Sequence, residues 1–116
     1  MGTKRTLKGW AKELYRIYQR NALRRRISWR LTRKALFLIV NQPCTYCGKK
    51  PANSMGNFYY SGIDRKDNNK GYAAENCIPC CKECNKIKSN LLSFEEMLEA
   101  MKAVKRVRGR KLPLKK

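Results

Sequence analysis

The sequence predicts a small α+β domain that is stabilised by bound zinc and carries basic helices at both ends. Two Cys-x-x-Cys pairs, Cys44/Cys47 and Cys81/Cys84, stand on either side of an aromatic, strand-like segment. Helical patterns of apolar residues precede the first pair and follow the second. A chain of 116 residues has room for one small domain, and a bound metal often supplements a core of this size.

The N-terminal segment is predicted to be an amphipathic helix. Its apolar residues, from Leu7 through Tyr18, recur at helical spacings of three and four. Another face repeats a basic residue every fourth position: Lys8, Lys12, Arg16, Arg20 and Arg24. Like charges at this spacing repel one another, so we expect phosphates to neutralise this basic ridge. Arg25 and Arg26 extend the same cationic segment.

A second helix is predicted from Arg33 to about Asn41. Thr32 is a suitable N-cap, and Pro43 ends the helix just before the first Cys pair. The segment from Ile27 to Leu31, between the two helices, is expected to be extended.

The centre of the chain is predicted to hold short strands joined by a turn. The aromatic segment 58–63 suggests one strand, and residues 67–71 suggest a turn because Asp, Asn and Gly accept unusual backbone angles. A second extended piece is expected at 76–79, and a short helix is expected to begin around Cys84.

A final helix is predicted to begin at the capping box Ser93-x-x-Glu96. Its apolar residues form one stripe: Phe94, Met97, Leu98, Met101 and Val104. We expect this stripe to pack back onto the metal-binding module.

The two Cys-x-x-Cys pairs predict a structural zinc site of four thiolates, Cys44, Cys47, Cys81 and Cys84. The chain has no His, so an all-Cys site is the simple arrangement. Cys77 and Cys80 offer an alternative second pair in the same register, although they also suit a buried apolar role.

The charge distribution predicts a nucleic-acid partner. The net charge is +20, and it is concentrated in residues 1–40 and 101–116, which flank a nearly neutral centre. No membrane span and no signal peptide are visible, so we expect a protein of the reducing cytoplasm that does not act on membranes.

Several motifs in order resemble the small HNH endonucleases that are common in bacteriophages. They are Cys44-x-x-Cys47-Gly48, Gly62-Ile63-Asp64-Arg65-Lys66-Asp67-Asn68, Lys70-Gly71-Tyr72, Glu75-Asn76, Cys80-Cys81-x-x-Cys84-Asn85 and Lys88-Ser89. The resemblance covers roughly residues 15–103. It implies a ββα-metal module on a treble-clef zinc scaffold.

The resemblance also implies a catalytic site that binds a divalent cation. Asp64 and Asn85 match the family's two metal-binding positions, and their oxygen ligands suit Mg²⁺ or Mn²⁺. Lys86 and Lys88 would contact the nucleic acid, which we expect to be double-stranded DNA. For a phage protein the location would be the bacterial host cytoplasm.

Arg65 departs from the family pattern, which places a His base at this position. A guanidinium does not release its proton at accessible pH, so Arg65 can clamp a phosphate but cannot activate water. Asp67, a tyrosine (Tyr59, Tyr60 or Tyr72) or a metal-bound hydroxide would have to replace the base.

Two functions therefore follow from the sequence. The first is an HNH-type endonuclease that nicks or cleaves DNA, with Asp64, Arg65 and Asn85 as catalytic residues. The second is a zinc-stabilised nucleic-acid-binding protein without activity, such as a phage nucleoprotein, a packaging accessory or a ribosomal-type component. In both cases the predicted organisation is a basic helical arm (1–41), an HNH-like domain with a C-terminal helix (42–108) and a basic tail (109–116).

Overall fold

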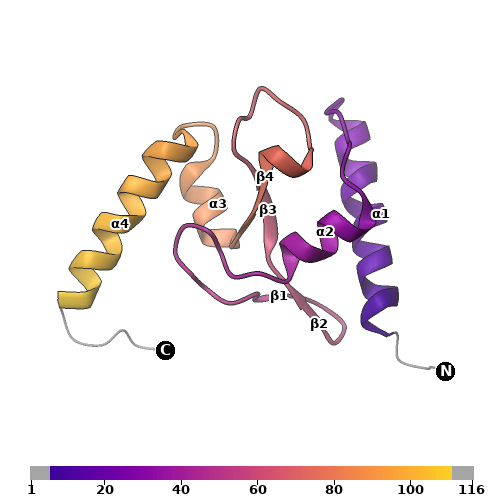
Figure 1. The fold of residues 1–116 in the computed structure, drawn as a ribbon, viewed down its shortest axis with the longest axis horizontal. Helices are drawn as coiled ribbons and strands as arrows, with labels where there is room; N and C mark the ends of the chain where they lie inside the picture. Colours follow the sequence, from indigo (N-terminus) through magenta and orange to yellow (C-terminus); the bar gives the residue numbers. More distant parts are fainter. Residues whose placement is uncertain (1–5, 111–116) are drawn as a thin grey trace.

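The computed structural model describes residues 6–110, and these form an α+β domain as predicted. In chain order the elements are α1 (Leu7–Arg24), α2 (Arg33–Val40), β1 (Asn53–Met55), β2 (Phe58–Tyr60), β3 (Gly62–Arg65), the 3₁₀ turn η1 (Ala74–Asn76), β4 (Cys77–Cys80), α3 (Lys82–Lys88) and α4 (Phe94–Arg110). The long helices α1 and α4 lie on opposite sides of the β3–β4 hairpin (Figure 1). No helix in this part of the chain is both long and apolar enough to cross a membrane.

The predicted helix caps are confirmed. The Thr32 hydroxyl accepts the Ala35 N–H at 3.1 Å and caps α2. At the start of α4, Ser93 and Glu96 form a reciprocal capping box: the Ser93 N–H donates to the Glu96 carboxylate at 2.8 Å, and the Glu96 N–H donates to the Ser93 hydroxyl at 3.0 Å. These contacts involve residues three positions apart, so local sequence determines them.

The prediction of one continuous strand over residues 58–63 is wrong. The segment divides into β2, which pairs antiparallel with β1, and β3, which pairs antiparallel with β4 in a separate sheet. The break falls at Ser61, whose N–H donates to the Val40 carbonyl at 2.7 Å and whose hydroxyl donates to the Gln42 carbonyl at 2.6 Å. The last carbonyl of α2 thus takes the Ser61 N–H, the backbone donor that a continuous strand could have used in its ladder.

Two apolar clusters hold the fold together. The larger one joins α1 and α2 to both hairpins through buried residues that include Leu14, Leu36, Val40, Phe58 and Ile63. The smaller one surrounds the cysteine pairs and receives Met97 and Met101 from α4, with Phe94, Leu98 and Val104 packed against it. The predicted packing of α4 onto the metal-binding module is therefore confirmed.

The N-terminal helices are integral to the larger cluster, because Leu14 and Ala22 of α1 are buried there. The division into segments 1–41, 42–108 and 109–116 stays a prediction. Most of the predicted tail, residues 111–116, lies outside the described residues.

Candidate functional site

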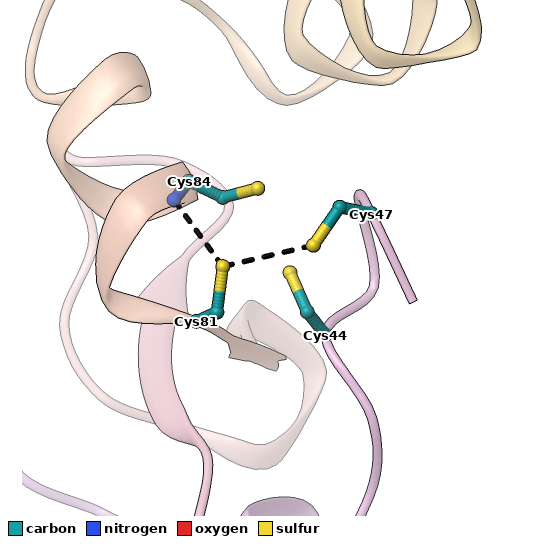
Figure 2. Close-up of side chains that lie close together, drawn as sticks. All are labelled: Cys44, Cys47, Cys81 and Cys84. Carbon is teal, nitrogen blue, oxygen red and sulfur yellow. Dashed lines mark hydrogen bonds between the residues drawn. The ribbon is translucent and has the colours of Figure 1, made fainter. Parts of the chain in front are cut away.

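Four thiols converge between the first knuckle and the start of α3. The sulfur atoms of Cys44, Cys47, Cys81 and Cys84 all lie within 4.8 Å of one another, and they point toward a common centre (Figure 2). Cys47 Sγ and Cys81 Sγ are 3.7 Å apart. A tetrahedral shell with metal–sulfur bonds of about 2.3 Å has edges of about 3.8 Å, whereas a disulfide would need about 2.05 Å. The geometry therefore fits a metal ion held by the four predicted cysteines.

The two knuckles differ in how readily their thiols ionise. Burial raises the pKa of Cys81 to about 11 and also raises the pKa of Cys84, so these two thiols would need the charge of a bound cation to ionise. In the first knuckle Gly48 has φ +81°, and its N–H donates to the Cys44 carbonyl at 2.9 Å. In the second knuckle Cys81 caps α3, with its sulfur accepting the Cys84 N–H at 3.3 Å. Burial opposes ionisation of Cys44, but backbone donors such as Cys47 and Cys81 outweigh it and lower the Cys44 pKa to about 7.

Cys77 and Cys80 are not part of the four-thiol cluster. Cys77 is buried in the larger apolar cluster, and Cys80 is fully buried beside the second knuckle. Burial raises the pKa of Cys77 to about 11, and it raises the pKa of Cys80 as well, so both thiols hold their protons. The alternative in which Cys77 and Cys80 replace Cys81 and Cys84 does not occur in this structure.

Asp64 lies inside the domain, with 5% of its surface exposed. The Tyr46 hydroxyl donates to Asp64 Oδ2 at 2.5 Å, and the Lys88 ammonium donates to Asp64 Oδ1 at 3.3 Å. Burial and the bond to Asp64 raise the pKa of Tyr46, which keeps this donor protonated. Both carboxylate oxygens are therefore engaged with donors of the protein itself.

Lys88 is fully buried, at 0% exposure, and it also donates to the Arg65 carbonyl at 3.2 Å. A buried ammonium cannot contact a phosphate from outside, so the predicted nucleic-acid role of Lys88 is wrong. Its position could have been read from the sequence: Lys88 follows Cys84 by four residues and so lies on the face of α3 that carries a buried metal ligand.

Arg65 braces the loop that follows β3. Its guanidinium Nη1 donates to the carbonyls of Asn68 at 2.9 Å and Lys70 at 2.8 Å. The guanidinium carbon Cζ lies 5.3 Å from the centre of the Tyr72 ring. The predicted turn at 67–71 is confirmed. Its Asp67 carboxylate accepts the Asn69 N–H at 2.9 Å, so this acid is used in an Asx turn.

Asn85 is exposed, and it faces a pocket at the start of α3. This Asn85 pocket has a volume of about 460 Å³. Besides Asn85, its walls include two hydroxyls, an amide and two lysines: Tyr18, Tyr60, Asn53, Lys82 and Lys86. Burial raises the pKa of Tyr18 and of Tyr60, and in Tyr18 the neighbouring tyrosines add to the effect. Of the other tyrosines considered as bases, Tyr59 is exposed on β2 and Tyr72 is buried under Arg65.

A divalent cation bridging Asp64 and Asn85 does not fit this arrangement. Asp64 is buried with both oxygens hydrogen-bonded, and it does not line the pocket that Asn85 faces. The lining of that pocket contains no carboxylate, although hard cations prefer charged oxygen ligands.

Sequence reasoning missed Tyr18, Asn53 and Lys82 as pocket residues. Tyr18 belongs to the apolar stripe of α1, and nothing in its spacing separates a pocket wall from a core position. The predicted nucleic-acid residues of α1 and of the following turn are all exposed: Lys8, Lys12, Arg16, Arg20, Arg24, Arg25 and Arg26. Arg16 also contacts Glu13 at 3.8 Å.

The fold resembles that of a nuclease. The structure of the rare-cutting HNH restriction endonuclease PacI matches 94% of this chain and 85% of the PacI chain, with a TM-score of 0.70 and 23% sequence identity. An uncharacterised protein of Acanthamoeba polyphaga mimivirus is 33% identical over 76 residues, which is 66% of this chain but 14% of that protein. The chain thus spans only a small part of this relative. No family model matches the sequence. Together with the four-thiol cluster, the likeness to PacI shows that the chain has an HNH endonuclease fold.

Proposed function

We propose that this protein is an HNH-type endonuclease that hydrolyses phosphodiester bonds in double-stranded DNA. The observation that carries the proposal is the Asn85 pocket, in which Lys82 and Lys86 surround the exposed amide at the start of α3. In PacI the same fold belongs to a restriction endonuclease. The α1 ridge supplies a cationic surface that suits a DNA backbone.

The metal held by the four cysteines is proposed to be zinc, with a structural role. Four thiolates complete its tetrahedral shell and leave no open position for substrate. The zinc would hold the first knuckle against the start of α3, which is the element that carries Asn85. Zinc therefore acts on the reaction only through the shape of the pocket.

The pocket residues are proposed to bind and polarise the scissile phosphate. Lys82 and Lys86 would neutralise the charge that develops on its oxygens. The raised pKa values of Tyr18 and Tyr60 keep their hydroxyls protonated at neutral pH, so they can donate hydrogen bonds but cannot take a proton from water. Because Asp64 is engaged with Lys88 and Tyr46, no step is assigned to a cation held by Asp64.

Nicking of a supercoiled plasmid tests this function. The assay is run under three conditions: without added cation, with Mg²⁺ and with Mn²⁺. We expect the zinc-loaded protein to nick the plasmid. Asn85→Ala should lower the nicking rate by about 10²-fold or more, as loss of a positioned polar group in an active site does. Asn69→Ala is the matched control, because Asn69 is an exposed amide in the turn after β3. Equal rates for both variants would show that the Asn85 pocket is not the active site.

A second candidate function is DNA binding without cleavage, for example in a viral nucleoprotein or packaging complex. It is favoured by the contacts of Asp64 and Arg65, since both side chains are used inside the fold. Here the protein should bind DNA but nick no plasmid under any of the three cation conditions. Arg65→His should then also fail to cut, whereas a gain of nicking would identify a nuclease frame that lacks only its base.

A further inference from the structure

A second hollow lies between α1 and α2, and it shares no lining residue with the Asn85 pocket. Its volume is about 810 Å³. Its rim carries four cations, Lys8 and Lys12 from α1 and Arg33 and Lys34 from α2, and its floor includes Ala11 and Phe37. No acidic residue lines this α1–α2 groove. The two helices lie side by side in Figure 1, so residues distant in sequence supply the two walls.

The charges at the groove are unfavourable for the folded protein alone. Both helices begin beside it, and neither has an acidic residue in its first turn. A cation near a helix N-terminus opposes the helix dipole. Lys8, Arg33 and Lys34 all stand in such positions. Among the described residues none of the four rim cations forms an ion pair, so an anion bound in the groove would meet no competing carboxylate of the fold.

These cations do not stabilise the starts of the two helices. Side-chain N-caps stabilise the helix starts instead. Thr6 accepts the Gly9 N–H at 3.0 Å in α1, and Thr32 accepts the Ala35 N–H at 3.1 Å in α2. Four like charges from two elements, around an apolar floor, suit a ligand with several anionic groups. A nucleic-acid backbone presents such groups in series. The groove also continues the ridge of α1, whose Lys8 and Lys12 belong to both.

We infer that the α1–α2 groove is an anchoring site for the phosphate backbone of duplex DNA, separate from the site of cleavage. Arg33 and Lys34, together with Lys8 and Lys12, hold phosphates there without reading the base sequence. The inference rests on the proposed function only in taking DNA as the polyanion. It concerns where the duplex is held, and it does not depend on whether the protein cuts.

The salt dependence of DNA binding tests the groove. The affinity for a fluorescent duplex of random sequence would be measured by anisotropy over a range of NaCl concentrations, without added divalent cation. The slope of log affinity against log salt is negative, and each lost phosphate contact reduces its magnitude by about 0.9, so Arg33→Gln/Lys34→Gln should reduce that magnitude by about 2. Lys50→Gln/Lys70→Gln removes the same charge from two exposed positions in the nearly neutral centre of the chain and should leave the slope unchanged. Circular dichroism checks that both variants are folded.

Two outcomes would overturn the inference. If both pairs of substitutions reduce the magnitude of the slope equally, net charge alone governs binding. If the groove pair leaves the slope unchanged, DNA does not contact Arg33 and Lys34. A nicking assay with the wild-type protein separates this failure from failure of the proposed function, because nicking by the wild type does not depend on how the groove variant responds to salt. If the protein never nicks DNA but shows the expected change in slope, the groove inference stands and the proposed endonuclease activity is wrong.

Discussion

The buried pair of Lys88 and Asp64 changes the role expected for both residues. The family resemblance makes Asp64 a ligand for a divalent cation, whereas in the structure an ammonium of the protein itself lies 3.3 Å from the carboxylate. A second donor, the Tyr46 hydroxyl, takes the other oxygen. The three side chains come from the first knuckle, β3 and α3, so the pair joins the elements that surround the metal-binding cysteines. Asp64 is thereby a structural counter-ion in this arrangement.

Removing either partner of this pair should destabilise the domain strongly. Lys88→Met and Asp64→Asn should each cost about 3–5 kcal/mol, because each leaves a buried polar partner uncompensated. The double variant should lose much less than the sum of the two. Urea denaturation of the four proteins measures this coupling.

The exposed pair of Lys49 and Glu83, 3.1 Å apart, is the matched control and should show little coupling. A cycle for Lys88 and Asp64 with equally little coupling would mean that the two are not paired in solution. Asp64 would then be free to ligate a cation, as the resemblance implies.

Residues whose partners are near in sequence were the ones that could be predicted. Thr32 and Ser93 follow from such short spacings. The four clustered cysteines were also predictable, although their two pairs are distant in sequence, because each Cys-x-x-Cys pair is recognisable by itself. The break at Ser61 could not be predicted, because it depends on carbonyl groups at the end of α2, about twenty residues earlier in the chain. The walls of the Asn85 pocket likewise come from several elements, so only Asn85, Tyr60 and Lys86 had been singled out.

At the scale of elements, the β1–β2 hairpin is fixed to α1 by a tight contact. A Cβ added to Gly56 would lie 2.1 Å from the Trp10 ring, and Gly56 has φ +60°. The Trp10 indole N–H donates to the Asn57 side chain at 2.6 Å. The turn of this hairpin therefore holds Trp10 by both shape and hydrogen bonding, and the hairpin carries Tyr60 toward the Asn85 pocket.

Gly56→Ala should destabilise the protein by about 2–4 kcal/mol, because it combines a left-handed backbone with a steric overlap. Gly109→Ala is the control, since an added Cβ there meets nothing within 4 Å and alanine favours a helix. Thermal unfolding should show a lower midpoint for Gly56→Ala and an equal or higher midpoint for Gly109→Ala. Equal midpoints for the two variants would argue against the contact with Trp10.

At the scale of the whole molecule, stability is divided between two apolar clusters, and the smaller one surrounds the four thiols. Met97 and Met101 attach α4 to the fold through this cluster, and Lys66 adds a contact with the Phe94 ring. Small domains commonly supplement a limited apolar core with a structural metal. Metal binding is therefore expected to be part of folding itself.

The purified protein should contain one zinc ion per chain, measured by mass spectrometry of the metal. Cys84→Ala should lose the zinc and unfold at lower temperature, because three thiolates leave the tetrahedral shell incomplete. Cys77→Ala should keep the zinc and lose only about 1 kcal/mol of packing in the larger cluster. Retention of zinc by Cys84→Ala with its loss in Cys77→Ala would exchange the roles of the two cysteines.

The short helix α2 connects two places that have been described separately. Its first turn supplies Arg33 and Lys34 to the α1–α2 groove, and its last carbonyls hold Ser61, which stands between Tyr60 and Gly62 in the wall of the Asn85 pocket. Eight helical residues span only about 12 Å. One end of this helix therefore presents cations to the groove, and the other end fixes the backbone between two pocket-wall residues. A substitution that unwinds α2 should disturb both places at once.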